Sequence, residues 1–243
     1  MIKGIYVVLY IAIVAILSMP LYLFVCIVGI FDKKKKAWYS QKIVSAIFKI
    51  LIFTIGVKIE ASGMEKVPRD EPVLFISNHR GFADIVAVYT TCPITVGFVS
   101  KKEVKKVPCL RTWMKFLNCL FLDRENIKEG LKTILQGIEN IKNGYSMIIM
   151  PEGTRSKEEG VLPFKKGSFK MAEKTKCKIV PVAISNSDEV LEKHMPKVKA
   201  CTVTIQYGDA IDYANLSKEE QKTIATDVRD VIIKMLDNIK NQA

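Results

Sequence analysis

The sequence "FISNHRGFADI", residues 75–85, joins two segments of different character through a short polar turn. Its first residues complete "PVLFIS" (72–77), an apolar run of the kind that forms a buried strand, and "ADIVAVY" (83–89) reads as the start of a helix. The turn carries His79, one of only two histidines in the chain, and Asp84 follows five residues later. A strand, a turn and a helix in succession are the unit from which α/β sheets are built.

The same alternation continues along the chain. Short apolar or alternating runs bounded by structure-breaking residues predict further strands at 94–100, 119–123, 146–150, 178–185 and 201–208. No linker, repeat or low-complexity block interrupts the chain beyond residue 58. We therefore expect an α/β fold with a mostly parallel central sheet flanked by helices, preceded by an N-terminal membrane-anchoring helical segment.

Two helical patterns between and after these strands are the clearest. The first ends at Asn143-Gly144 and places on one face Ile127, Leu131, Ile134, Leu135, Ile138 and Ile141. The second begins at Ser217, with Glu220 in the spacing of a capping box. Its predicted buried side consists of Ile224, Val228, Val231, Ile232, Met235 and Ile239.

Hydrophobic residues make up 49% of the 243-residue chain, and the N-terminus holds the excess. Ile5 to Phe31, 27 residues, contains no charged side chain. As a helix it is roughly 40 Å long, which exceeds the ~30 Å hydrocarbon core of a bilayer. A cleaved signal peptide fits less well, because the run is too long and no small-residue cleavage site follows it. A bent hairpin at Pro20 that dips into one leaflet is the alternative to a span.

Lysines flank these apolar segments. "DKKKK" (32–36) follows the first run, so the positive-inside tendency places the rest of the chain on the cytoplasmic face of the cell membrane. In the next segment, 37–57, Lys42 and Lys49 lie on one helical face, which is typical of a helix along the membrane surface. A second buried or spanning helix is the alternative.

The distribution of charge and of cysteines indicates which binding partners and metal sites are compatible with the sequence. The net charge is +12, and residues 1–57 hold +6 of it. This clustering favours an anionic bilayer or lipid headgroup over nucleic acid, since no nucleic-acid-binding motif accompanies the lysines. The six cysteines show no C-x-x-C spacing, which argues against a disulfide framework and a zinc site.

His79 and Asp84 are the first candidates for chemistry. A carboxylate in the first turn of a helix that binds one imidazole nitrogen leaves the other nitrogen free to accept a proton from a hydroxyl. No G-x-S-x-G motif supplies an enzymic serine, so the hydroxyl belongs to a substrate. An H-x4-D pair by itself also fits an ordinary core histidine. The second histidine, His194, is predicted to be a solvated loop residue.

Two basic stretches suggest an anionic ligand. In "MPEGTRSKEEGVLPFKKGSF" (150–169), a glycine after a strand and Arg155 suit phosphate binding, although a surface turn with a solvated arginine fits the bare G-x-R pattern equally well. The stretch 99–126 interleaves lysines with apolar and aromatic residues, which suits an amphiphile with an anionic head. A solvated helix face explains most of these lysines; Lys101, nearest a strand end, is the exception.

Four blocks together resemble the glycerolipid acyltransferase family, whose best-known members are lysophosphatidate acyltransferases. The blocks are "NHRGFAD" (78–84), "FLDR" (121–124), "PEGTRS" (151–156) and "VPVAI" (180–184), in family order. They span about half of the chain. One departure is visible, because the family often has serine where this chain has Gly81, and Arg80 adds a cation beside His79.

The resemblance implies transfer of a fatty acyl group from acyl-CoA or acyl carrier protein to the sn-2 hydroxyl of lysophosphatidate, which gives phosphatidate in phospholipid biosynthesis. It implies His79 as general base and Asp84 as its orienting partner. The implied phosphate-binding residues are Lys101, Arg124, Glu152, Gly153, Thr154 and Arg155. Residues 1–57 would anchor the protein in the bilayer and 58–243 would form the catalytic domain. No metal and no bound cofactor is expected.

Some alternatives stay open at this point. Another acyltransferase of the same family would use glycerol 3-phosphate or a different lysophospholipid, and a non-catalytic member would only bind anionic lipid. The oxyanion of the reaction needs N–H donors, and we expect them from the backbone near the His79 turn.

Overall fold

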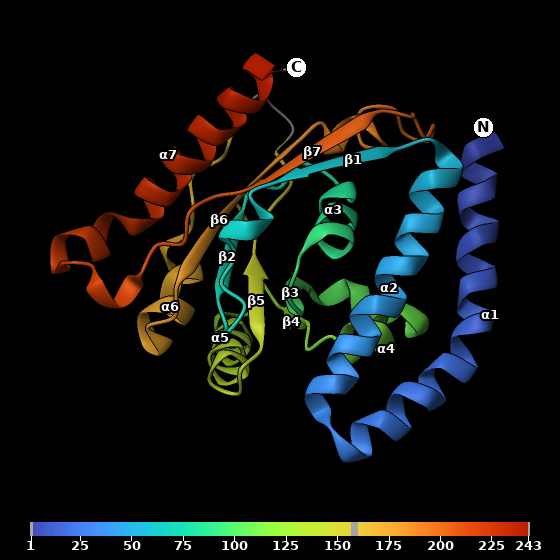
Figure 1. Cartoon of the computed structure of the whole chain (residues 1–243), viewed down its shortest axis with the longest axis horizontal. Coiled ribbons are helices and arrows are strands. Elements are labelled where there is room, and N and C mark those ends of the chain that lie inside the picture. The colour runs from blue at the N-terminus through green and yellow to red at the C-terminus, as the bar shows by residue number, and fades with distance from the viewer. Residues whose placement is uncertain (1, 157–159, 243) are drawn as a thin grey trace.

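The chain forms one seven-stranded sheet, seen nearly edge-on in Figure 1. The computed structural model describes residues 2–156 and 160–242. The strands are β1 (Lys58–Ser62), β2 (Leu74–Ser77), β3 (Val96–Lys101), β4 (Leu120–Leu122), β5 (Ser146–Ile149), β6 (Ile179–Ser185) and β7 (Thr202–Tyr207), in the spatial order β1-β7-β6-β2-β5-β3-β4. Every neighbouring pair is parallel except β6 with β7. The predicted α/β class with a mostly parallel sheet is confirmed.

Helices cover both faces of this sheet. The α-helices are α1 (Ile2–Phe31), α2 (Lys33–Ile55), α3 (Ala83–Thr91), α4 (Pro108–Phe116), α5 (Ile127–Lys142), α6 (Lys170–Thr175) and α7 (Lys218–Gln242). Short 3₁₀ turns occupy Met64–Lys66, Lys102–Lys106, Lys166–Phe169, Ser187–Glu189 and Tyr213–Asn215. Helices α2, α3 and α4 pack on one face, and α5, α6 and α7 pack on the other (Figure 1).

The central strands explain why two helical layers form. Along β2, Phe75 packs into the cluster under α2, α3 and α4, while Leu74 and Ile76 pack into the cluster under α5, α6 and α7. All three side chains are almost completely buried. Successive side chains of a strand point to opposite faces, so a continuous apolar run such as "LFIS" requires cover on both sides.

Two predictions from local pattern need correction. The apolar face of α5 is buried at Ile138 and Ile141, but its first half is exposed: Ile127 at 88%, Leu131 at 51% and Leu135 at 53%. This half of α5 lies beside the three-residue edge strand β4 and has little sheet to pack on. In α7 the predicted buried side is found, except that Val231 is 37% exposed. Strand β1 was not predicted, since its "KIEAS" sequence is short and half-exposed at the sheet edge.

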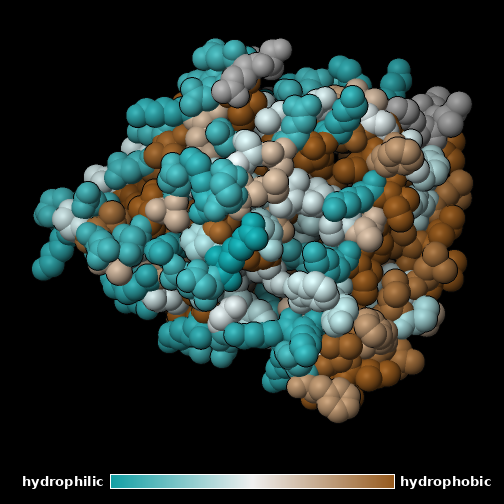
Figure 2. Space-filling model, in the orientation of Figure 1, coloured by the Kyte–Doolittle hydropathy of each residue, from teal (hydrophilic) through white to brown (hydrophobic). Residues whose placement is uncertain are grey.

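Helices α1 and α2 form an antiparallel hairpin along one side of the molecule (Figure 1). Asp32 begins the second helix, since its side chain accepts hydrogen bonds from the N–H groups of Lys34 and Lys35. Figure 1 shows a bend in α1, which contains Pro20. Both helices are long and apolar enough to cross a membrane. The outer face of α1 contributes much of the apolar surface in Figure 2.

The hairpin is also packed against the sheet layer. The buried amide of Gln41 donates to the carbonyl of Ile94 at 2.7 Å and accepts from the N–H of Val96 at 2.9 Å. On α1, the Ser18 hydroxyl accepts from the indole of Trp113 at 3.0 Å. Lys42 and Lys49 are exposed. One face of α2 is therefore part of the core, and its placement along a membrane surface stays a prediction.

Candidate active site

The candidate site lies at the carboxyl ends of the parallel strands. Strands β2, β3, β4, β5 and β6 run in one direction, so the loops that follow them meet at one edge of the sheet. The loop after β2 carries His79, and the loop after its neighbour β5 carries Glu152 and Arg155. Two sequence blocks separated by about seventy residues therefore become adjacent.

His79 and Asp84 form a short hydrogen bond. Nδ1 of His79 lies 2.7 Å from Oδ2 of Asp84, and the same oxygen accepts from the backbone N–H groups of Arg80, at 2.9 Å, and Gly81, at 3.0 Å. Asp84 lies in the first turn of α3, as predicted, and its side chain is completely buried. Three donors directed at one carboxylate oxygen place the imidazole proton on Nδ1.

This arrangement leaves the second imidazole nitrogen available. Nε2 of His79 has no hydrogen-bond partner among the described residues, and the side chain is 19% exposed. A neutral imidazole with its proton fixed on Nδ1 carries a lone pair on Nε2. His79 can therefore accept a proton from a hydroxyl that enters the site.

Glu152 supports this loop from β5. Its Oε1 accepts from the backbone N–H of His79 at 2.6 Å and its Oε2 accepts from the N–H of Leu162 at 2.9 Å. The carbonyl of His79 in turn accepts from the N–H of Ser156 at 2.9 Å. Burial raises the pKa of Glu152, although the two N–H donors act in the opposite direction. The third block thus holds the backbone of the first on both sides of His79.

Asn78 ties the first block to the fourth. Its buried side-chain amide donates to the carbonyl of Ile184 at 2.9 Å and accepts from the N–H of the same residue at 2.9 Å. Because both ends of the amide are satisfied, the residue before His79 is fixed to the end of β6.

The expected oxyanion donors are engaged elsewhere. The N–H of His79 donates to Glu152, those of Arg80 and Gly81 donate to Asp84, and that of Phe82 donates to Glu192. The identity of the oxyanion donors therefore stays a prediction, since these four N–H groups have carboxylate partners in this structure. These N–H groups instead hold three carboxylates around the loop.

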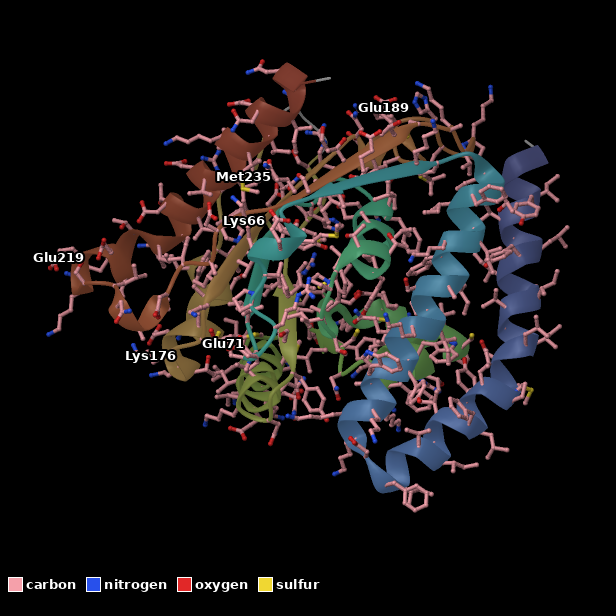
Figure 3. The ribbon with its side chains drawn as sticks, viewed as in Figure 1. Lys66, Glu71, Lys176, Glu189, Glu219 and Met235 are labelled. Atoms are coloured by element: carbon pink, nitrogen blue, oxygen red, sulfur yellow. The ribbon has the colours of Figure 1, made fainter. Side chains whose placement is uncertain are left out.

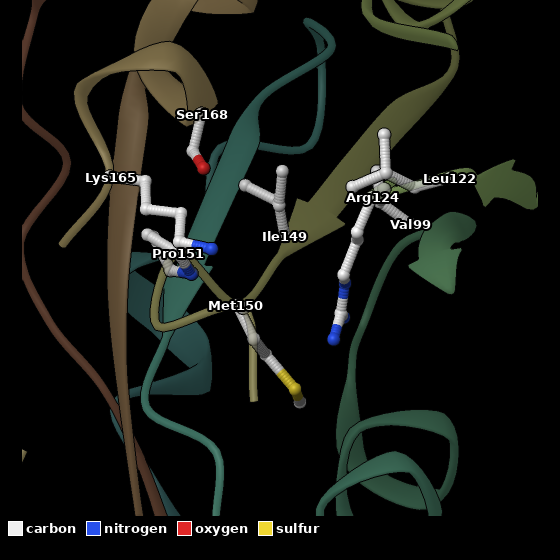
Figure 4. Close-up of a pocket in the computed structure, with 9 residues that line it drawn as sticks. Val99, Leu122, Arg124, Ile149, Met150, Pro151, Lys165 and Ser168 are labelled. Atoms are coloured by element: carbon white, nitrogen blue, oxygen red, sulfur yellow. The ribbon is translucent and has the colours of Figure 1, made fainter. Parts of the chain in front are cut away.

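A small cavity of ≈ 50 Å³ brings part of the predicted phosphate site together (Figure 4). It is lined by Arg124, which follows β4, and by Gly153 of the third block. Lys165 also lines it, and its Nζ lies where a side chain at Gly153 would begin. The sequence analysis did not name Lys165 as a phosphate-site residue. The only sequence signal for it is that it belongs to the basic stretch 150–169, where it is followed by a second lysine.

The other predicted phosphate residues lie around this cavity rather than in its wall. Lys101 ends β3 and pairs in register with Leu122, which lines the cavity. Thr154 is exposed, and among the described residues the N–H groups of Thr154 and Arg155 have no acceptor. The guanidinium of Arg155 contacts Glu192 at 2.7 Å.

Two basic side chains near the loop have carboxylate partners. Arg80 donates through Nε and Nη2 to the buried Asp188, at 3.0 and 2.9 Å, so its charge is balanced. His194, predicted to be a solvated loop residue, is in fact about one-third exposed and lies 3.0 Å from Glu189. Neither contact involves His79.

The buried thiols are not poised for nucleophilic attack. Burial raises the pKa of Cys119 to about 11 and that of Cys92 to about 12, so both remain protonated at neutral pH. Within residues 2–156 and 160–242, no group of three or more His, Cys, Asp or Glu side chains is arranged to hold a metal ion. The absence of a bound metal or cofactor stays a prediction.

Comparison with known proteins identifies the family. The model of the Acyltransferase family matches residues 58–185, which is more than half of the chain. This chain belongs to the acyltransferase family. The family match begins where β1 begins and contains His79, Asp84 and the "PEGTR" turn.

Two members of this family are similar to the protein over most of its chain. The 1-acyl-sn-glycerol-3-phosphate acyltransferase of Borreliella burgdorferi is 30% identical over 80% of this chain and 78% of its own length. The enzyme of the same name from Saccharomyces cerevisiae is 30% identical over 83% of this chain and 66% of its own.

A crystal structure is similar over nearly the whole chain. The 1-acyl-sn-glycerophosphate (LPA) acyltransferase PlsC from Thermotoga maritima aligns with a TM-score of 0.82 and 26% identity, covering 98% of this chain and 97% of its own. The resemblance read from the four blocks is therefore confirmed, and the similarity includes the N-terminal helices.

Proposed function

We propose that this acyltransferase transfers a fatty acyl group from a thioester to the sn-2 hydroxyl of lysophosphatidate, which gives phosphatidate. The observation that carries the proposal is the 2.7 Å contact of His79 Nδ1 with Asp84, which leaves Nε2 without a hydrogen-bond partner in the part of the chain that the structure describes. The names of the relatives supply the acceptor, since several are 1-acyl-sn-glycerol-3-phosphate acyltransferases. The donor is acyl-CoA or acyl carrier protein.

The proposed reaction needs one proton acceptor and no covalent enzyme intermediate. Nε2 of His79 takes the proton of the acceptor hydroxyl as its oxygen attacks the thioester carbonyl carbon. Asp84 stabilises the imidazolium that forms. When the tetrahedral intermediate collapses, the carbon–sulfur bond breaks and His79 returns the proton to the departing thiolate. One ester bond forms and one thioester bond breaks, so the step is balanced.

The acceptor phosphate is proposed to bind at the basic edge of the cavity. Arg124 and Lys165 approach it from opposite sides in Figure 4. The guanidinium of Arg155 adds further donors on the same turn, as do the N–H groups of Thr154 and Arg155, which have no acceptor among residues 2–156 and 160–242. Lys101 contributes positive charge from the end of β3. Glu152 and Gly153 shape the turn, Glu152 through its backbone contacts and Gly153 through its left-handed backbone at φ 72°.

The N-terminal hairpin is proposed to seat the protein in the cytoplasmic leaflet. The middle of α1 contacts α4, since Ser18 accepts from Trp113 and the Tyr22 hydroxyl donates to the carbonyl of Cys109 at 3.1 Å. Lipid cannot surround that part of α1, which favours a hairpin in one leaflet over a simple span. A single cysteine placed before Ile5 tests this: labelling from the cytoplasmic side supports the hairpin, and labelling only from the opposite side supports a span.

The first experiment measures thiol release from acyl-CoA and, separately, from acyl carrier protein by the purified protein in detergent. Lysophosphatidate, glycerol 3-phosphate and lysophosphatidylcholine serve as separate acceptors. The variant His79→Ala is compared with His194→Ala, which removes the other histidine of the chain and leaves the His79 loop intact. We expect lysophosphatidate-dependent release that falls by on the order of 10²–10⁴ in His79→Ala and persists in His194→Ala.

Each outcome has a definite meaning. Thiol release with another acceptor alone would support the acyl-transfer mechanism but would show that lysophosphatidate is not the acceptor. A His79→Ala variant that retains the full rate would remove the general-base assignment. No release with any acceptor and either donor, by a protein that remains folded, would overturn the proposal as a whole.

A further inference from the structure

Glu192 lies outside the four sequence blocks, yet it contacts two of their loops. Its Oε1 accepts from the backbone N–H of Phe82 at 2.8 Å and from Nη1 of Arg155 at 2.7 Å. Phe82 directly precedes α3 and lies two residues from Asp84. One carboxylate oxygen therefore connects the His79 loop with the arginine of the third block.

This carboxylate is confined. The Glu192 side chain is 15% exposed, and its Oε2 is buried. A Cβ atom at Gly81 would lie 2.6 Å from Oε2 and 2.9 Å from the carbonyl of Ser187, so glycine is needed at 81 for space. The serine that the family often has at this position does not fit beside Glu192. Burial of Oε2 and the two hydrogen bonds of Oε1 restrict the movement of the Glu192 carboxylate.

The contact decides the orientation of Arg155. The arginine side chain is 54% exposed, and a free arginine loses rotamer entropy when it is ordered. Glu192 engages Nη1 and leaves the other N–H donors of the guanidinium for an anion. Ordering Arg155 before a ligand arrives reduces the cost of binding.

Glu192 also exerts an opposing effect, because its negative charge repels a phosphate. The phosphate of the proposed acceptor meets three further cations, Lys101, Arg124 and Lys165, which offset that repulsion. Glu192 is fixed in place, and its charge is already balanced by Arg155 at 2.7 Å. The ordering of Arg155 is therefore the larger effect.

We propose that Glu192 is a positioning residue that holds Arg155 in the orientation that grips the acceptor phosphate, with Gly81 as the glycine that makes room for it. The inference rests on the proposed function, because it assigns the phosphate of lysophosphatidate to Arg155.

The test is a double-mutant cycle on KM. Wild type, Glu192→Ala, Arg155→Ala and the double variant are assayed at varied lysophosphatidate and at varied acyl donor. We expect Glu192→Ala to raise KM for lysophosphatidate about tenfold, the equivalent of one charge-assisted contact, and to leave KM for the donor unchanged. In the Arg155→Ala background the same substitution should change KM for lysophosphatidate no further, because the side chain that it positions is gone.

Two further variants keep the cycle interpretable. Glu192→Gln retains the size of the side chain and one acceptor oxygen, so it should fold even if Glu192→Ala does not. We expect it to raise KM for lysophosphatidate by about threefold. Glu189→Ala removes a carboxylate three residues earlier that pairs with Lys193, His194 and Lys199 and does not touch Arg155. It should leave KM for lysophosphatidate unchanged.

The inference would be overturned if KM for lysophosphatidate falls or stays constant in Glu192→Ala, or if the effects of the two substitutions simply add in the double variant. In either case, acylation of lysophosphatidate by the wild type would preserve the proposed function. If folded wild-type protein does not acylate lysophosphatidate at all, the proposed function fails first and this inference falls with it.

Discussion

Oε1 of Glu152 lies 2.6 Å from the backbone nitrogen of His79, and this hydrogen bond joins the third sequence block to the first. The glutamate of "PEGTR" therefore acts on the loop that presents the imidazole. Its second oxygen is held by the N–H of Leu162. A side chain expected to shape a phosphate site supports the His79 loop through its main chain.

Glu152→Gln should destabilise the protein. Both carboxylate oxygens accept backbone N–H groups, so the amide must point its NH₂ at one of these donors and leave it unpaired. We expect a loss of about 1–3 kcal/mol in the free energy of unfolding, measured by denaturant titration in detergent. Glu139→Gln, on an exposed i,i+3 pair with Lys142, is the matched control and should change it by less than about 0.5 kcal/mol. Equal losses in the two variants would contradict this account.

Asp84→Asn should abolish most activity with the fold retained. Oδ2 of Asp84 accepts from Nδ1 and from two backbone N–H groups, so the amide oxygen of asparagine takes its place. The neutral amide, however, no longer stabilises the imidazolium that forms during proton transfer. We expect kcat to fall by on the order of 10²–10⁴. Steady-state kinetics measures the fall, and circular dichroism checks the fold. A folded variant with near-normal kcat would show that the negative charge of Asp84 is not needed for proton transfer to His79.

Gly81→Ser should lower both activity and thermal stability, because the new Cβ lies 2.6 Å from Glu192 Oε2. The expected destabilisation is about 1–3 kcal/mol. Adding Glu192→Ala to the serine variant should recover part of this loss; the carbonyl of Ser187 at 2.9 Å limits the recovery. Thermal midpoints of the two single variants and the double variant measure the effect. Strictly additive losses would mean that the two positions do not compete for space.

Gln41→Ala should loosen the hairpin from the sheet layer. The substitution leaves the carbonyl of Ile94 and the N–H of Val96 without their partner, at a cost of about 1–3 kcal/mol. Differential scanning calorimetry in detergent measures the loss, and limited proteolysis between α2 and β1 should become faster. Ala46→Ser, on the exposed side of the same helix, is the control. An unchanged melting temperature in Gln41→Ala would show that the packing of the hairpin on the sheet layer does not contribute to the stability of the catalytic domain.

Glu189, labelled in Figure 3, should make stability depend on pH in the acid range. Hydrogen bonds from Lys193, His194 and Lys199 lower the pKa of Glu189 from 4.5 to about 2. A carboxyl whose pKa is depressed by folding stabilises the native state above its unfolded pKa, and this contribution is lost as pH falls from 4.5 towards 2.

Wild type should therefore melt at a higher temperature than Glu189→Gln at pH 6, and the difference should shrink as the pH is lowered through this range. Solvent screening keeps the effect small, because the side chain is 27% exposed. A difference that is constant with pH would exclude the carboxylate charge as its source.

Much of this architecture could be predicted from local sequence. The strand at 72–77 and the helix begun at Ser217 follow from runs of apolar residues and from capping chemistry, both of which act over a few neighbouring residues. The pairing of His79 with Asp84 is equally local, since only the short loop between β2 and α3 separates them. Those features are short-range, and a single sequence contains them.

The tertiary structure decided which distant groups meet. The registers of β2 with β5 and with β6 bring Glu152 under His79 and Ile184 beside Asn78. The same packing engages the backbone donors expected for the oxyanion and pairs Arg155 with Glu192. Partner choice across a sheet depends on long-range contacts that pair buried polar groups with one another. The order of residues along the chain does not contain that information until the strands pair.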